Sequence, residues 1–387
     1  MKKLFFIAVA ALAIGACSKV QTVDIQNEIN FKVANYVQTK ATGSVYDNGA
    51  FGTYSWFTTT GYAPTDFMVN EEVAHVGGVW KTKNNTFYWP KTGSLEFISY
   101  SPFNGTNATA DSNPAITPNT ITYTGVNTAA VDVSNNPLNI DYMYADKAIA
   151  SKNINVVTDG VESGYSGVPT IFHHALAKLS FNIKANFVSW TDSKTNTTTT
   201  WDVKVTSAKI SGFKTIGDCT LTLNTDAEGV TMPWNKPYTT VGSNKYYVWT
   251  NLSGASVEQE LIDATTYPSG VILTTEEQNL NAASGFVMPQ ILEDNTQKID
   301  LTIHITTHLA NGNTIEEDFH PVIDIKGISS IKAWEMNQNI IYTINIKPTA
   351  KADGDAGHDN DPEDVIITFD PAVADWTTVK TNATIQL

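Results

Sequence analysis

The feature that most constrains the fold is a period-two alternation of apolar and polar residues, which recurs along much of the chain. Between Ala177 and Lys184 the alternation is strict. Successive side chains of a strand point to opposite faces, so this pattern predicts strands with one buried face. It recurs in 29–33, 201–205, 299–305, 340–346 and 365–369. No amphipathic helix longer than two turns is evident, and short strands joined by Thr, Asn, Ser and Gly predict an all-β fold of sandwiches or barrels.

The first 17 residues have the pattern of a bacterial lipoprotein signal. Lys2 and Lys3 precede an apolar run that is shorter than the ~20 residues needed to span a bilayer. Small residues at Gly15 and Ala16 then lead to Cys17, the residue expected to receive the lipid. We therefore expect residues 1–16 to be a signal peptide and the mature chain to begin at Cys17 on the outside of the cytoplasmic membrane.

The length and composition predict two packed domains. Hydrophobic residues make up 42% of the 387-residue chain, which allows substantial cores, and a single core rarely serves more than ~250 residues. Turn-forming residues between Ala150 and Thr170 suggest the boundary. We expect an N-terminal domain over 17–168 and a C-terminal domain over 169–387. The latter includes an acidic hinge at 351–364 and a terminal strand segment at 365–387.

Charge and cysteine content exclude several functions. The formal net charge is −15 and the sequence contains no arginine, so nucleic acid is not an expected partner. If Cys17 is acylated, Cys219 has no intramolecular partner, and no disulfide supports the fold. Cys219 is expected to be a small buried hydrophobe.

Candidate metal ligands and catalytic residues find little support. His304 and His308 lie in an alternating segment, which would separate them by ~13 Å and prevent them from sharing a metal ion. The adjacent His173 and His174 point to opposite faces of a strand, which suggests packing or surface roles. The acidic run 351–364 could offer oxygens to calcium, but it lacks the pattern of an EF-hand loop. We expect no metal, no cofactor and no enzymatic activity, although two distant carboxylates could still meet in space.

Several segments resemble the fimbrillin family of Bacteroidetes, the fimbria subunits and their relatives. The similar segments are INFKVANYVQTKAT, FYWPKTGSLEFISYSP, FHHALAKLSF, FVMPQIL, WEMNQNIIYTINI and ITFDPAVADW, in this order from Ile29 to Trp376. The resemblance implies two transthyretin-like β-sandwich domains, in agreement with the strand pattern. It also implies a lipoprotein precursor that reaches the outer surface, where a protease cuts after a basic residue beyond the first strand. The groove left by that strand accepts the carboxy-terminal strand of a neighbouring subunit.

This chain offers a residue for each of these roles. Cleavage between Lys40 and Ala41 would free the first strand, whose inward residues would be Ile29, Phe31 and Val33. Its loss would expose unpaired backbone groups beside an apolar trough, which invites strand addition. The donor strand would carry Val365, Ile367, Phe369 and Trp376. The best-known members are cut after arginine, which this chain lacks. Lys40 could also be an ordinary loop lysine, and the terminal strand could simply complete its own domain.

The sequence thus predicts a structural fimbria subunit, exported as an outer-membrane lipoprotein and polymerised with other fimbrial subunits by strand exchange for surface adhesion. A tip or anchor subunit is an alternative within that class. A monomeric surface lipoprotein that binds glycans is an alternative from another class, because Trp80, Phe87, Tyr88 and Trp89 could form a platform for sugar rings. The same aromatic residues could instead be core residues.

Overall fold

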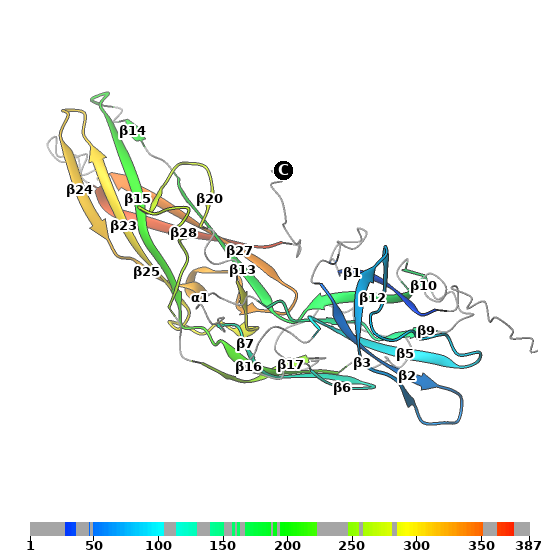
Figure 1. Ribbon diagram of the computed structural model, residues 1–387. Helices are drawn as coiled ribbons and strands as arrows, with labels where there is room; N and C mark the ends of the chain where they lie inside the picture. Colours follow the sequence, from blue (N-terminus) through cyan, green and yellow to red (C-terminus); the bar gives the residue numbers. More distant parts are fainter. Residues whose placement is uncertain are drawn as a thin grey trace, which may run out of the picture.

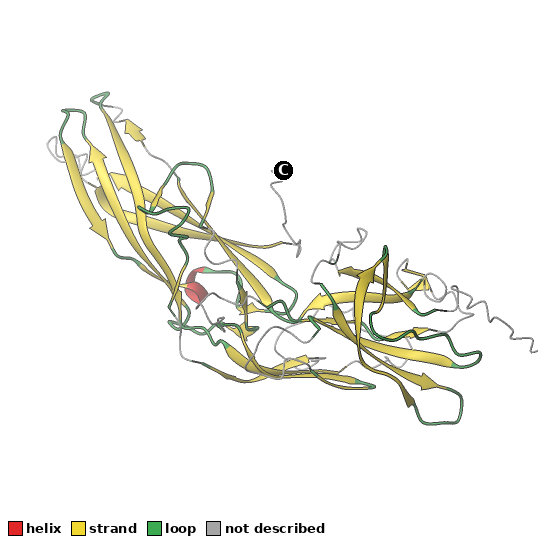
Figure 2. Ribbon diagram, viewed as in Figure 1, coloured by secondary structure: helices red, strands yellow, loops and turns green. Residues whose placement is uncertain are grey.

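A computed structural model of the chain confirms the all-β prediction (Figure 2). It describes residues 28–35, 46, 49–103, 114–129, 140–150, 157–158, 161–162, 167–186, 189–191, 194–222, 247–254, 258–280, 285–350 and 362–374. Among these residues the single helix is the one-turn α1 (Ile325–Ile328). Figure 1 shows two lobes with a third group of strands along the lower side between them.

The N-terminal lobe is a ring of strands around an apolar core (Figure 1). In sheet order its strands are β2 (Phe51–Thr58), β3 (Thr65–Val76), β4 (Val79–Thr82), β1 (Asn30–Asn35), β12 (Val168–His174), β8 (Met143–Ala145), β5 (Ser94–Ser101) and β9 (Ala148–Ala150). A pairing of β2 with β5 closes the ring. A small hairpin joins β10 (Val157–Thr158) to β11 (Val161–Glu162). The inward faces carry mostly Phe, Met, Leu and Val, as the alternation requires.

The C-terminal lobe is a sandwich of two sheets. One sheet contains β20 (Gln278–Asn279), β13 (Ala177–Ala185), β27 (Asn339–Ala350) and β28 (Pro362–Ala374), with β21 (Phe286–Val287) also on β13. The other contains β14 (Ser189–Thr191), β15 (Thr198–Ser211), β23 (Lys298–His308) and β24 (Thr314–Phe319), with β18 (Gln259–Glu260), β19 (Val271–Ile272) and β25 (Val322–Asp324) at its margins. The pair β22 (Gln290–Ile291) and β26 (Ala333–Trp334) stands apart.

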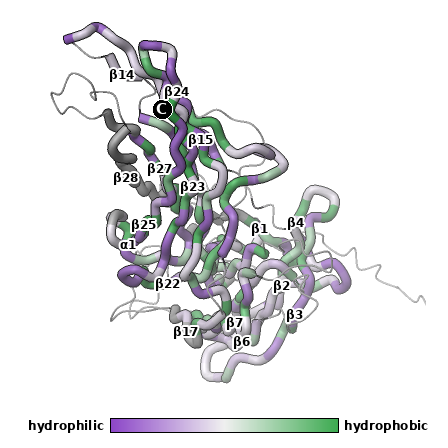
Figure 3. Tube along the Cα trace, turned by 90° about the vertical axis from the view of Figure 1, so that its left-hand side faces the viewer, coloured by the Kyte–Doolittle hydropathy of each residue, from purple (hydrophilic) through white to green (hydrophobic). Residues whose placement is uncertain are grey.

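Alternation explains how these two sheets pack. Every second residue of β23 is buried, and the hydropathy colours alternate along β15 and β23 in Figure 3. The buried residues meet those of β13 and β27 in one apolar cluster, in which Trp201, Trp334 and Tyr342 are the largest side chains. Such a half-buried sheet face is what period-two sequences specify.

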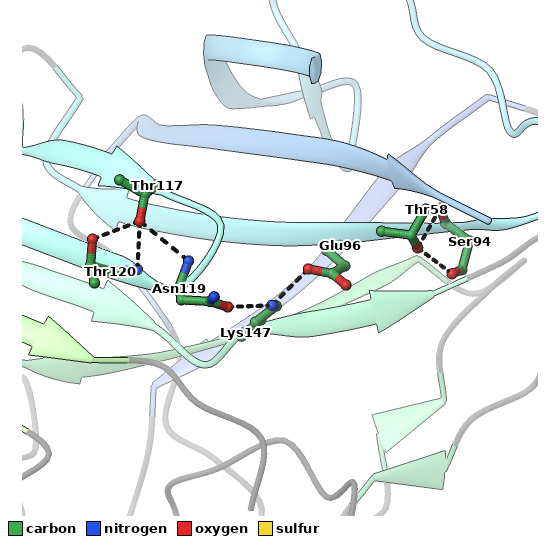
Figure 4. Close-up of polar contacts among 7 residues, drawn as sticks. All are labelled: Thr58, Ser94, Glu96, Thr117, Asn119, Thr120 and Lys147. Atoms are coloured by element: carbon green, nitrogen blue, oxygen red, sulfur yellow. Dashed lines mark hydrogen bonds and ion pairs between the residues drawn. The ribbon is translucent and has the colours of Figure 1, made fainter. Parts of the chain in front are cut away.

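A four-stranded sheet connects the two lobes. Its strands are β17 (Tyr247–Ser253), β16 (Ile216–Thr222), β7 (Thr120–Asn127) and β6 (Ala115–Thr117), so segments from both halves of the sequence pair with each other. Its buried residues join Trp56, Ala175 and Met336 in a shared core. In Figure 4 the buried Lys147 lies between Glu96 of β5, at 2.6 Å, and Asn119 of the β6–β7 turn, at 3.1 Å. This contact fastens the connecting sheet to the N-terminal lobe.

The chain passes from one lobe to the other through the fully buried residues Ala175 and Leu176. The N–H of Ala175 donates to Tyr142 at 2.7 Å, and its carbonyl accepts from the indole of Trp249 at 3.1 Å. Asn337, in a left-handed conformation, donates its N–H to the carbonyl of Leu176. The passage therefore lies just after β12. The domain boundary that we expect from the sequence, between residues 168 and 169, follows the first residue of β12. The connecting sheet also spans that boundary.

The environment of Cys219 leads to a testable prediction. This thiol is fully buried in the shared core, and burial raises its pKa. Because the thiolate is the reactive form, we expect Cys219 to resist thiol-specific reagents in the native protein and to react at once after denaturation. The measurement is a thiol titration of a Cys17→Ser variant with and without denaturant. Fast native labelling would contradict the buried placement.

Candidate functional site

Strand β1 is an interior strand of the N-terminal ring (Figure 1). It pairs in parallel with β12, from Phe31 opposite Val168 to Asn35 opposite Phe172. On its other side it pairs antiparallel with β4, where Phe31 lies opposite Trp80. Its backbone is therefore paired with β12 from Phe31 to Asn35 and with β4 at Asn30 and Phe31. Taking β1 away would leave a slot bounded by two unpaired strand edges.

The inward side chains of β1 fill an aromatic pocket. Ile29 and Phe31 are 1% and 4% exposed, and Val33 packs half-buried against the same core. The ring of Phe31 meets Phe51 and Phe97 edge to face, with centroids 5.7 and 5.9 Å away. Full burial of such a side chain contributes about 1.5–3 kcal/mol. The floor of the slot under β1 is thus strongly apolar.

Contacts at its first residues also hold β1 in position. The N–H of Ile29 donates to Phe87 at 2.9 Å, and Glu28 forms a bridge with Tyr88. On β12's side, a Cβ added at Gly167 would lie 3.1 Å from backbone atoms of Phe31 and Lys32. Since Gly167 has φ +110°, both its conformation and this close approach favour glycine. The wall of the slot is shaped to the backbone of a strand.

Strand β28 lies on its own C-terminal sandwich. It pairs antiparallel with β27 from Ala374 opposite Asn339 to Pro362 opposite Ala350. Phe369 and Ile367 lie opposite the core residues Ile344 and Ile346. In the order of this sheet, β28 is the edge strand beside β27. Val365 follows the same alternation, opposite Pro348.

Four residues of the proposed site lie outside the described residues. They are the lipid-attachment residue Cys17, the cleavage pair Lys40 and Ala41, and the donor residue Trp376. The signal segment 1–16 and most of the acidic run, 351–361, also lie outside them.

The two histidines of β23 stand apart, each with its own aspartate partner. His304 is 2.8 Å from Asp318 of β24, and His308 is 2.8 Å from Asp202 of β15. Both side chains are partly exposed, at 34% and 42%. Nowhere in the described ranges do three His, Cys, Asp or Glu side chains gather closely enough to hold a metal ion.

The sequence reasoning missed the partners of the buried histidines on β12. His173 lies 2.9 Å from Asp146, and His174 lies 2.8 Å from Asp141. Both aspartates flank the short strand β8, which pairs with β12. Burial lowers the pKa of nearby Lys178, and Asp141 opposes that shift. These pairs stabilise the end of β12 beside the lobe junction. Because each aspartate lies about 30 residues from its histidine in the sequence, no local pattern predicts the pairing.

The aromatic residues considered for sugar binding are mostly packed in the core. Trp89 is 6% exposed, and Trp80 and Phe87 pack against the same cluster that holds Phe31. Tyr88 is 42% exposed and has no exposed aromatic neighbour among these three. They do not form a flat platform.

The comparisons with known proteins decide the family. The sequence matches the profile of a family described as fimbrillin-like over residues 39–376. The chain belongs to this fimbrillin-like family. A search among curated proteins gave no match. Within the part of the chain that the structure describes, no helix has the length and apolarity to cross a bilayer.

A solved fimbrial protein shares the fold. A fimbrial protein from Bacteroides vulgatus superposes with a TM-score of 0.53 and 14% identity, covering 91% of this chain and 100% of that one. The fimbrial anchor protein Mfa2 from Porphyromonas gingivalis gives a TM-score of 0.26 and 9% identity, covering 90% of this chain and 98% of that one. The family supports a fimbrial subunit, and the first of these two similarities shows the shared fold.

The packing of Phe31 predicts how strongly β1 is held. Truncation by Phe31→Ala removes a buried ring from the pocket of Phe51 and Phe97 and should lower the free energy of unfolding by about 3–5 kcal/mol. The exposed Lys32 on the same strand is the matched control, and Lys32→Ala should change it by less than about 0.5 kcal/mol. Denaturant unfolding of the unprocessed chain measures both. Equal effects of the two substitutions would contradict the inward packing of β1.

Proposed function

We propose that this fimbrillin-like chain is a structural fimbria subunit that polymerises by donor-strand exchange for surface adhesion. In this scheme it is exported as an outer-membrane lipoprotein acylated at Cys17 and is then cut between Lys40 and Ala41. The cut releases β1, and the carboxy-terminal segment of another fimbrial subunit enters the slot. The single observation that carries the proposal is the two-sided pairing of β1 above an apolar floor.

An empty slot would have a higher free energy than a slot filled by another strand. Release of β1 would leave hydrogen-bonding groups of β12 and β4 unpaired and expose the pocket of Phe31. An unpaired edge beside an apolar trough is a template for an incoming strand, which restores both the ladder and the burial. Contacts of this kind run head to tail and do not close on themselves, so they build filaments.

The donor is proposed to come from the carboxy-terminal segment. Val365, Ile367 and Phe369 have the alternation of a donor, but in the subunit itself they belong to β28 and pair with β27. Using them as the donor would strip an edge from the C-terminal sandwich. We therefore propose that the part of the donor that enters a neighbour's slot begins at Trp376. In this scheme β28 stays paired with β27 and holds the donor segment to its own subunit.

The alternative of a monomeric glycan-binding lipoprotein loses its main support with the packing of Trp80, Phe87 and Trp89. A tip or anchor role concerns the same fold and differs in processing. An anchor subunit would keep its acylated Cys17, whereas a stalk subunit would lose it together with β1.

The decisive residue for processing is Lys40. Lys40→Gln should leave the precursor intact and abolish its appearance in sheared surface filaments, because β1 would remain in the slot. The control Lys19→Gln changes a lysine whose cleavage would not free β1 from the chain. Amino-terminal sequencing of sheared material measures the outcome, with Ala41 expected as the first residue. Filament-associated copies that still begin at Cys17 would rule out strand release in this chain.

A further inference from the structure

The lysine that links the N-terminal lobe to the connecting sheet is unusually buried. Lys147 lies between β8 and β9, and its side chain is 6% exposed. In the other lysine–carboxylate pairs of the described residues, the lysine side chains are 28–54% exposed. A buried ion pair is weak evidence for stability, because apolar residues of similar volume often stabilise a core as well. Stability alone therefore does not explain why a lysine occupies this position.

Two groups of different chemistry contact the Nζ atom of Lys147 (Figure 4). The carboxylate of Glu96, on β5, accepts from it at 2.6 Å, and the side-chain carbonyl of Asn119 accepts from it at 3.1 Å. Glu96 is itself only 17% exposed. An amine, a proton acceptor within hydrogen-bond reach and a primary amide thus lie together. These are the three groups required to form an amide bond between two side chains.

The turn between β6 and β7 holds Asn119 in this position. Pro118 fixes one backbone angle of the turn, and the Thr117 hydroxyl accepts from the N–H groups of Asn119 and Thr120, at 3.4 and 3.1 Å. Asn119 is also exposed, so a small leaving group released there has a path to water. Holding two reacting groups in contact replaces a bimolecular encounter and raises their effective concentration by orders of magnitude.

We propose that Lys147 and Asn119 become joined by a side-chain amide bond that forms without an enzyme in the folded chain. The Nζ atom of Lys147 first gives a proton to the Glu96 carboxylate, which converts a buried ion pair into two neutral groups. The Nζ lone pair then forms a bond to Cγ of Asn119, and the bond from Cγ to Nδ2 breaks. Glu96 passes the two protons that Nζ loses to the departing nitrogen, which leaves as ammonium. The carboxylate is restored, and no oxidant or cofactor is consumed.

The bond would fasten the connecting sheet covalently to the N-terminal lobe. Asn119 and Lys147 are 28 positions apart in the sequence, so the bond closes a sizeable loop. Cross-links of this kind stabilise a fold mainly by restricting the unfolded chain. The thiol of Cys219 is free, so the amide would give this junction a covalent link that no disulfide of Cys219 provides. The inference does not depend on the release of β1.

The test is mass spectrometry of the full mature chain with Cys17→Ser, unfolded before the measurement. We expect the intact mass to lie below the sequence mass by one ammonia. Between Lys91 and Lys147 the sequence contains no lysine or arginine, and trypsin does not cleave after an acylated lysine. Digestion should therefore yield segment 92–152 uncut and lighter by one ammonia. A chain at the sequence mass that is cut normally after Lys147 would overturn the proposal.

Substitutions separate the covalent bond from the ion pair. Glu96→Gln keeps the size of the side chain but removes the proton acceptor, and Asn119→Ala removes the amide that is attacked. Both variants should have their own sequence mass and be cut after Lys147. The control Glu72→Gln alters a lysine–glutamate pair of 2.8 Å on the surface and should leave the ammonia loss unchanged. Ammonia loss that persists in Asn119→Ala would place the reaction at another residue and overturn the proposal.

Discussion

The architecture of the N-terminal lobe depends on the double pairing of β1. One six-residue strand supplies hydrogen bonds to β4 and β12 and places Ile29 and Phe31 in the middle of an aromatic core. The ring of strands is closed only while a strand occupies this position. Whatever fills the position must satisfy two edges and one apolar floor at once, which restricts the occupant to an alternating, extended segment.

Several parts of this arrangement could be predicted from the sequence, because they depend on the local alternation of apolar and polar residues. Alternation and residue type alone predict that Ile29 and Phe31 face inward and that Cys219 is buried. They also predict the strands around Leu179 and Ile303. The separation of His304 and His308 follows from strand geometry in the same way. Membership of the fimbrillin-like family was recognisable from short segments spread between Ile29 and Trp376.

Other parts could not be predicted, because they depend on partners far apart in the chain. The pairing of β7 with β16 joins residues such as Thr122 and Thr220, and no periodicity encodes which strand a given strand selects. The aspartate partners of His173 and His174 could not be predicted for the same reason. The alternation of 365–369 marked a strand correctly, but it could not tell whether that strand completes its own sandwich or serves another molecule.

The connecting sheet has a consequence for how the protein reaches its final form. Hydrogen-bonded neighbours in β7 and β16 are separated by 98 residues at Thr122 and Thr220, so the amino-terminal half cannot finish folding before the other half has emerged. Contacts of such long sequence separation slow folding, because a large loop must be closed before they form. The whole polypeptide therefore stays incompletely folded for longer, and a truncated translation product would expose the unpaired β6–β7 hairpin to proteolysis and aggregation.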